Sequence, residues 1–122
     1  MKINLLFILY FIIYNSYSQD KIEWIELDNN VEYTNNGKKI IIDLYTDWCG
    51  WCKVMDKNTF TDSEVISLIN KNFSPVKFNA EYQENVNFND NSFKFIKSGN
   101  RGINELAYHL TNGKLSYPMT IF

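Results

Sequence analysis

The sequence predicts a single α/β domain in which a central sheet is flanked by helices. Residues 40–42 are an unbroken run of isoleucines, which favours a strand buried on both faces, as in a parallel sheet covered by helices. The two cysteines of the chain, Cys49 and Cys52, follow this run at Cys-x-x-Cys spacing. A further strand pattern at residues 75–79 and a helical pattern at residues 103–110 complete the α/β arrangement.

Residues 1–18 predict a signal peptide. Lys2 provides a short positive segment, residues 5–13 form an apolar core of nine residues, and residues 16–18 place small side chains where a signal peptidase reads them. Nine apolar residues fall short of the roughly 20 that span a bilayer. We therefore expect export to the periplasm or another extracytoplasmic space, a mature domain over residues 19–122 and no stable membrane span after cleavage. An uncleaved anchor is the alternative.

The segment before the cysteines predicts two strands. Residues 24–27 alternate between apolar and polar side chains, which indicates an edge strand, and residues 40–45 indicate the central strand. Thr46 and Asp47 then offer side chains that cap helices. We expect a helix to begin at the cysteines and to continue through residues 53–57.

The segment after this helix predicts a second helix and a third strand. Residues 61–64 read Thr-Asp-Ser-Glu, which resembles a capping box, and the helix should end at residues 70–72. Its apolar residues, which we expect in the core, are Val65, Ile66, Leu68 and Ile69. Residues 75–79 alternate and indicate a strand with Pro75 at its first position.

The last helix is predicted over residues 103–110. Leu106, Ala107 and Leu110 form its apolar face. Asn112 and Gly113 follow it, as is common where helices end.

Residues 79–102 form an asparagine-rich segment between the third strand and this helix. Apolar residues recur at period-2 spacing on both sides of residues 89–91, which indicates a small hairpin. These residues are Val86, Phe88, Phe93 and Phe95. We expect a surface insertion that its phenylalanines anchor, and a substrate-binding arm is the alternative.

The order strand, short turn and helix opening on Cys-x-x-Cys indicates thiol–disulfide chemistry. A helix N-terminus directs unpaired N–H groups and the positive end of the helix dipole at Cys49, which favours its thiolate. Cys52 lies about one turn further and can close a disulfide, so we expect Cys49 to be the exposed attacking thiol and Cys52 the resolving thiol. Asp43 should lie in the strand beneath them, where burial raises its pKa and suits it to accept a proton from Cys52.

Two other interpretations of the cysteine pair remain open. A structural zinc site needs four ligands, and the chain offers two cysteines and one histidine, His109. A structural disulfide usually closes a longer loop than this one. Because the chain offers too few zinc ligands, we expect no metal, and we expect no other cofactor.

These residues resemble the thioredoxin family. Its members carry an aspartate six residues before a Trp-Cys-Gly-x-Cys motif, which Asp43 and residues 48–52 match. They also carry a cis-proline that faces the disulfide and opens a strand, and Tyr117 and Pro118 match that site. The resemblance covers residues 24–122 and is closest to extracytoplasmic bacterial members with the motif Asp-Trp-Cys-Gly-Trp-Cys-Lys. The chain departs from the usual motif because Trp51 replaces the proline between the cysteines.

The resemblance implies several features that the residues alone do not establish. It implies a helix over residues 31–36 and a cis bond between Tyr117 and Pro118. It also implies a substrate-binding surface made by Trp48, Gly50, Trp51, Tyr117 and Pro118. Thioredoxin-like domains continue with another strand and helix, whereas the sequence ends at Phe122, so we expect a fragment.

The implied function is thiol–disulfide exchange on exported proteins. The aspartate and the absence of histidine between the cysteines favour a reductase that works with a separate redox partner. A binding or chaperone-like module without redox turnover is the alternative. The net charge of −2 and the absence of a basic stripe argue against nucleic acid as a partner.

Overall fold

A computed structural model of the chain describes residues 21–28 and 37–122. The expected signal peptide and the helix expected over residues 31–36 lie outside the described residues.

The described part of the chain has a mixed four-stranded sheet at its centre, with the strand order β1-β3-β2-β8. The strands are β1 (Ile25–Glu26), β2 (Lys39–Tyr45), β3 (Phe73–Asn79) and β8 (Met119–Ile121). Strands β1, β3 and β2 are parallel, and β8 runs antiparallel to β2. The α/β class, the edge strand at residues 24–27 and the central isoleucine-rich strand are therefore confirmed.

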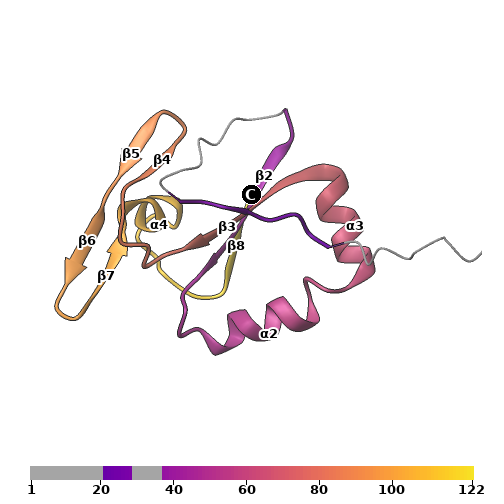
Figure 1. Ribbon diagram of the computed structural model, residues 1–122, viewed down its shortest axis with the longest axis horizontal. Helices are drawn as coiled ribbons and strands as arrows, with labels where there is room; N and C mark the ends of the chain where they lie inside the picture. Colours follow the sequence, from indigo (N-terminus) through magenta and orange to yellow (C-terminus); the bar gives the residue numbers. More distant parts are fainter. Residues whose placement is uncertain (1–20, 29–36) are drawn as a thin grey trace, which may run out of the picture.

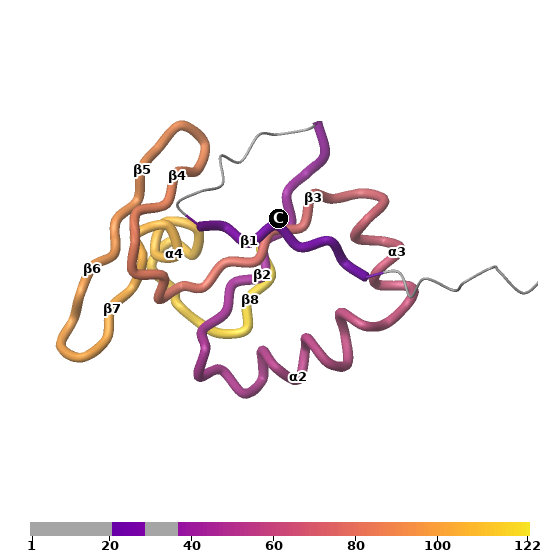
Figure 2. The backbone as a smooth tube through the Cα atoms, in the orientation of Figure 1, coloured from indigo at the N-terminus to yellow at the C-terminus, as the bar shows by residue number. Residues whose placement is uncertain are grey.

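Helices and hairpins cover the two faces of this sheet (Figure 1). The helices are α2 (Gly50–Asn58), α3 (Ser63–Asn72) and α4 (Glu105–Leu110). Figure 2 follows the chain through α2 and α3 on one side of the sheet and through α4 on the other, where the segment between β3 and α4 also lies. The path of the chain thus explains why the isoleucine run can be buried on both faces.

Two apolar clusters stabilise the two faces. Consecutive residues of β2 point to opposite sides, so Ile41 joins one cluster and Ile42 the other. The cluster beneath α3 contains Ile22, Ile41, Phe60, Ile66 and Ile69. The larger cluster, toward α4, contains Leu27, Ile42, Leu44, Val76, Phe78, Ala80, Val86, Phe88, Leu106 and Ala107. Burial of an aliphatic or aromatic side chain of this size contributes about 1.5–3 kcal/mol, so these clusters dominate the stability of the fold.

Three local predictions need correction. Leu68 is exposed rather than in the core, because only Ile66 and Ile69 of α3 face the sheet closely enough to be buried. Pro75 is the third residue of β3, not the first, and is tolerated because the β1 ladder begins only at Val76. The side chain of Asp62, rather than that of Thr61, caps α3, since Asp62 Oδ1 accepts hydrogen bonds from the N–H groups of the next turn.

The segment between β3 and α4 contains two hairpins. The predicted hairpin is confirmed as β4 (Val86–Phe88) and β5 (Asn91–Phe93), joined by two residues with positive φ. Val86 and Phe88 belong to the larger cluster and Phe93 packs against it, which confirms apolar anchoring by these three residues. The prediction is wrong for Phe95, which lies outside this hairpin and packs over Gly102 instead.

A second hairpin, β6 (Phe95–Ser98) and β7 (Arg101–Asn104), was not expected. The prediction that the last helix starts at Ile103 is therefore wrong. Ile103 and Asn104 complete β7, and the Asn104 side chain accepts a hydrogen bond from the Leu106 N–H and caps α4. Leu106 and Ala107 face the core as expected.

Membrane-crossing helices were sought among residues 21–28 and 37–122. None of the helices there has the length and apolar character needed to cross a bilayer.

Candidate active site

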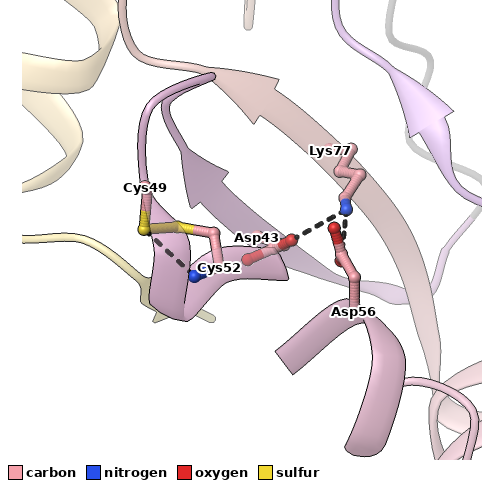
Figure 3. Close-up of a disulfide and its surroundings, with 5 residues drawn as sticks. All are labelled: Asp43, Cys49, Cys52, Asp56 and Lys77. Atoms are coloured by element: carbon pink, nitrogen blue, oxygen red, sulfur yellow. Dashed lines mark hydrogen bonds and ion pairs between the residues drawn. A yellow bond between two sulfur atoms is a disulfide. The ribbon is translucent and has the colours of Figure 1, made fainter. Parts of the chain in front are cut away.

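Cys49 and Cys52 form a disulfide at the start of α2 (Figure 3). The chain leaves β2 and turns within three residues, where the Cys49 N–H donates to the Thr46 carbonyl at 3.1 Å. Cys49 is the N-cap of α2, and its Sγ accepts a hydrogen bond from the Cys52 N–H at 3.1 Å. The disulfide, with 5.3 Å between the two Cα atoms, therefore sits at the positive end of the helix dipole.

The structure corrects two expectations for this turn. The α2 cap is the Cys49 sulfur, while the Oγ1 of buried Thr46 has no hydrogen-bond partner among the described residues and Asp47 is exposed. Cys49 is also not exposed: each cysteine has 4% of its surface accessible. The disulfide ties Cys49 to Cys52, which lies on the buried face of α2.

Asp43 lies in β2 below the disulfide and is 2% exposed. In Figure 3 its side chain projects from β2 toward α2, with the disulfide on one side and Lys77 on the other. Burial raises the pKa of Asp43, while the nearby Lys77 cation opposes that rise and the Asp56 carboxylate adds to it. The expected burial and the expected direction of the pKa shift are thus confirmed.

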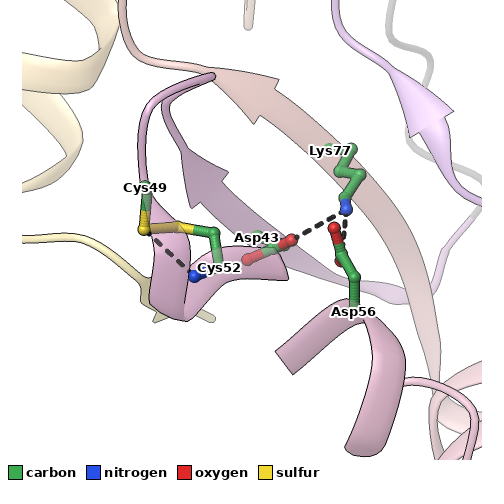
Figure 4. Close-up of polar contacts among 5 residues, drawn as sticks. All are labelled: Asp43, Cys49, Cys52, Asp56 and Lys77. Carbon is green, nitrogen blue, oxygen red and sulfur yellow. Dashed lines mark hydrogen bonds and ion pairs between the residues drawn. A yellow bond between two sulfur atoms is a disulfide. The ribbon is translucent and has the colours of Figure 1, made fainter. Parts of the chain in front are cut away.

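Lys77 is the cation closest to Asp43. The register of the parallel strands sets Lys77 opposite Asp43 on one side and opposite Glu26 on the other, so all three point to the same face of the sheet. The Lys77 Nζ lies 3.4 Å from Asp43 Oδ2 and also donates to Asp56 Oδ1 of α2 (Figure 4). Asp43 Oδ1 has no hydrogen-bond partner among the described residues.

Several acidic groups share this one cation. Burial raises the pKa of Glu26, and Asp43, Asp56 and Asp28 add to the rise while Lys77 opposes it. Burial, followed by the charges of Glu26, Asp47, Asp43 and Asp56, raises the pKa of Tyr45 to about 12. The Lys77 Nζ lies 5.2 Å from the centre of the Tyr45 ring, so cation–π attraction also holds it in place. The site is therefore partly desolvated and carries an excess of negative charge.

The surface around the disulfide is aromatic. Trp48 is 54% exposed and Trp51 is 73% exposed. The Trp48 ring contacts the Tyr117 ring edge to face, with 5.9 Å between centroids. The bond between Tyr117 and Pro118 is cis, as the resemblance implies, and β8 starts at the next residue.

The structure brings Trp48 and Tyr117 together and leaves Gly50 and Trp51 at the exposed start of α2. Sequence reasoning did not single out Lys77, Asp56 or Arg101. The alternation at residues 75–79 could have indicated Lys77, because it places that residue on one face of the strand. The guanidinium of Arg101 lies over the Trp48 ring, with its Cζ 5.3 Å from the centroid, and no sequence signal points to that contact.

His109 lies away from this site. It is exposed, and its ring contacts the Phe93 ring in a tilted arrangement with 5.6 Å between centroids, beside a surface cavity of about 610 Å³ between β5 and α4. The cavity is lined by Asn91, Ser92, Phe93, Glu105, Tyr108, His109 and Asn112. Within the part of the chain that the structure describes, His, Cys, Asp and Glu side chains form no group of three or more that could hold a metal ion.

Together, the fold and the site define a thioredoxin-like α/β domain with a Cys-x-x-Cys disulfide at a helix N-terminus. The family Thioredox_DsbH, described as "Protein of unknown function, DUF255", matches residues 12–122. The chain belongs to this family.

Shorter similarities connect the chain to proteins named thiol:disulfide interchange protein DsbD. That of Haemophilus ducreyi is 59% identical over 29 residues, or 24% of this chain and 5% of the relative. That of Actinobacillus pleuropneumoniae is 55% identical over 31 residues, or 25% of this chain and 5% of the relative. That of Escherichia coli K12 is 38% identical over 45 residues, or 37% of this chain and 8% of the relative. The chain thus spans a small fraction of these relatives, and no solved structure matches it significantly.

Proposed function

We propose that this protein is an extracytoplasmic thiol–disulfide oxidoreductase that reduces disulfides in exported proteins. The observation that carries the proposal is the Cys49–Cys52 disulfide at the start of α2. The Cys49 sulfur accepts a hydrogen bond from the Cys52 N–H there. A thiolate at this point is stabilised by that N–H and by the helix dipole. The similarity to thiol:disulfide interchange proteins supports the same chemistry.

In the proposed reaction, the reduced protein attacks a substrate disulfide. The Cys49 thiolate bonds to one substrate sulfur, and the other substrate sulfur leaves as a thiolate and takes up a proton. The Cys52 thiol then loses its proton to Asp43 and attacks Cys49, which releases the second substrate thiol and forms the Cys49–Cys52 disulfide. Two electrons pass from the dithiol to the substrate, and a separate redox partner must restore the dithiol.

Asp43 suits the role of proton acceptor because of its environment. Its pKa is raised by burial, and a base with a pKa closer to the working pH transfers protons more effectively. Its Oδ1 has no hydrogen-bond partner among the described residues, so one carboxylate oxygen is available for a proton.

Substrate binding is proposed for the aromatic surface around the disulfide. The exposed Trp48 and Trp51 rings offer apolar contacts to an extended polypeptide, and Gly50 between them in the sequence is also exposed, with nothing but its chain neighbours within 4 Å of an added Cβ. The backbone at Tyr117 and Pro118 would pair with the substrate as an added strand. Export follows in this proposal from the predicted signal peptide over residues 1–18.

An equilibrium redox titration of the full chain tests the direction of the reaction. Thiol alkylation and the fluorescence of Trp48 and Trp51 report the redox state. We expect a potential near that of thioredoxin, about −270 mV, as suits a reductase. A value near about −120 mV would instead make the protein an oxidant, and failure to interconvert dithiol and disulfide would leave the binding module as the better interpretation.

A further inference from the structure

The β6–β7 hairpin reaches the redox site through Arg101. Arg101 is the first residue of β7 and pairs with Ser98, so it lies beside the two-residue turn that closes the hairpin. Its guanidinium lies over the ring of Trp48, the residue directly before Cys49. Figure 1 shows the closed end of this hairpin at the same end of the molecule as the start of α2. The hairpin therefore brings a positive charge against Trp48, the residue that precedes Cys49 in the sequence.

The hairpin holds Arg101 in a defined position. At its base, the Lys94 carbonyl accepts a hydrogen bond from the Glu105 N–H at 2.8 Å, and Glu105 Oε2 accepts one from the Lys94 N–H at 2.8 Å. Along its length, the Phe95 ring packs so closely over Gly102 that a Cβ there would lie 2.3 Å from Phe95 Cζ. At its turn, Gly99 has a φ of +60°, which glycine adopts without strain. Arg101 is thus supported by ordered backbone rather than by a free loop.

The charge of this hairpin differs from that of the rest of the protein. Residues 95–104 contain two basic side chains and no acidic one, while the chain has a net charge of −2. Among the described residues, no carboxylate lies within 4 Å of the Arg101 guanidinium. A guanidinium over an aromatic ring uses its face for that contact and keeps its N–H donors, which lie in its plane, for another partner.

The neighbouring side chains suit a polypeptide partner. Residues paired across antiparallel strands share a face, so Ile96 and Ile103 lie on the same face of the hairpin as Arg101. Ile96 is 48% exposed on this face. Together with exposed Trp48, it provides apolar contacts beside a cation, as expected of a surface that binds an amphipathic segment of another protein.

From these observations we propose that the β6–β7 hairpin is a partner-recognition arm, in which Arg101 binds a carboxylate of the protein substrate close to its reacting sulfur. The protein thereby selects disulfides with acidic side chains nearby. This inference rests on the proposed function and adds the chemical class of its substrate. The Trp48 ring orients the guanidinium of Arg101. The bound carboxylate would supply the anionic partner that Arg101 lacks among the described residues.

A single-turnover experiment with the full chain tests this proposal. Two peptides would each carry one cysteine bonded to a neutral 2-thiopyridine group, with either glutamate or glutamine at the positions within two residues of the cysteine. The reduced protein attacks the peptide sulfur through Cys49 and releases thiopyridine, which is followed by absorbance. Cys52 then displaces the peptide thiol, so the dithiol supplies both electrons.

The measured quantity is the ratio of second-order rate constants for the glutamate and glutamine peptides. An exposed ion pair contributes up to about 1 kcal/mol, so we expect a ratio of about five at low ionic strength that falls as salt is added. Arg101→Gln should bring the ratio to about one, and Arg101→Glu should bring it below one.

Lys97→Gln is the matched control, because Lys97 belongs to the same hairpin and is also exposed, and the substitution removes the same single positive charge. Lys97 pairs with Gly102 on the opposite face, so its replacement should leave most of the preference intact. A ratio of one in the unmodified protein, or equal losses in Arg101→Gln and Lys97→Gln, would overturn the proposal. Failure of the proposed function itself is distinguishable, because neither peptide would then react faster with the protein than with a simple thiol such as reduced glutathione.

Discussion

Asp43 is the single residue whose environment differs most from that of an ordinary carboxylate. It is 2% exposed, and Lys77 compensates its charge only in part because it also binds Asp56. A buried carboxylate favours its protonated form unless enough hydrogen bonds and cations surround it. The same property that would let Asp43 accept a proton therefore costs stability when it is charged.

Replacing Asp43 with asparagine should change both activity and stability. Loss of a proton acceptor slows proton transfer by about a hundredfold or more, so the mixed disulfide with substrate should accumulate in Asp43→Asn. At neutral pH the variant should unfold at a higher urea concentration, because it buries no charge. Stopped-flow kinetics and urea titrations followed by tryptophan fluorescence measure the two effects.

The sign of the pH dependence follows from the raised pKa. Between the ordinary value of 3.8 and its raised value, folded Asp43 holds more protons than unfolded Asp43 does. Stability is therefore highest below this window and falls as the pH rises through the folded pKa. Asp43→Asn should remove most of this pH-dependent loss of stability. Glu26→Gln is the control, since partial burial also raises the pKa of Glu26, but its side chain is far more accessible to solvent than that of Asp43. Equal effects of the two variants would contradict a special role for Asp43.

At the level of elements, two parts of the fold determine the site. The register of β1, β3 and β2 places Glu26, Lys77 and Asp43 in one row on the face that α2 covers. The β6–β7 hairpin, which lies between β3 and α4 in the sequence, adds Arg101, whose guanidinium lies over the Trp48 ring. The hairpin depends on the close packing of Phe95 on Gly102, so Gly102 is the point at which its geometry is most sensitive.

Two glycine-to-alanine variants compare this hairpin with α2. In Gly102→Ala the new methyl group would meet both the Phe95 ring and the Ile96 carbonyl at less than 3.0 Å, and such overpacking typically costs about 1–3 kcal/mol. Gly50→Ala adds the same methyl group at the start of α2, where nothing lies within 4 Å, and should stabilise the fold by about 0.5 kcal/mol. Urea unfolding measures both. An unchanged free energy of unfolding in Gly102→Ala would contradict the tight packing of the hairpin.

At the level of the whole molecule, the sheet separates two apolar clusters, and the redox site lies where β2 passes into α2. The disulfide is attached to this folded framework, so its reduction potential and the stability of the fold are linked. A folded state that favours the disulfide makes the protein a reductant, whereas one that favours the dithiol makes it an oxidant.

The oxidised protein should therefore be more stable than the reduced protein. Closing a short loop in the unfolded chain contributes on the order of 2 kcal/mol by itself. Reduction would in addition place a new thiolate near the already negative cluster around Asp43, which Lys77 only partly compensates. Urea titrations in the presence and absence of a thiol reductant measure the difference. Higher stability of the reduced form would contradict the proposed direction of the reaction.

The sequence by itself determined the α/β class, the central strand, the helix that opens on the cysteines and the burial of Asp43. These features follow from local patterns: an apolar run, a Cys-x-x-Cys spacing and capping residues act on neighbours along the chain. The β4–β5 hairpin was predictable for the same reason, since alternation and the turn residues 89–91 mark it locally.

Only the tertiary structure decided which distant residues surround the disulfide. Strand order and register bring Lys77 to Asp43, and the path of the β6–β7 hairpin brings Arg101 to Trp48. Cys49 is buried and bonded to Cys52, although its position at a helix N-terminus alone predicted exposure. Such contacts depend on how elements pack in three dimensions, and periodicity along the chain carries no information about a contact between elements that are remote in sequence.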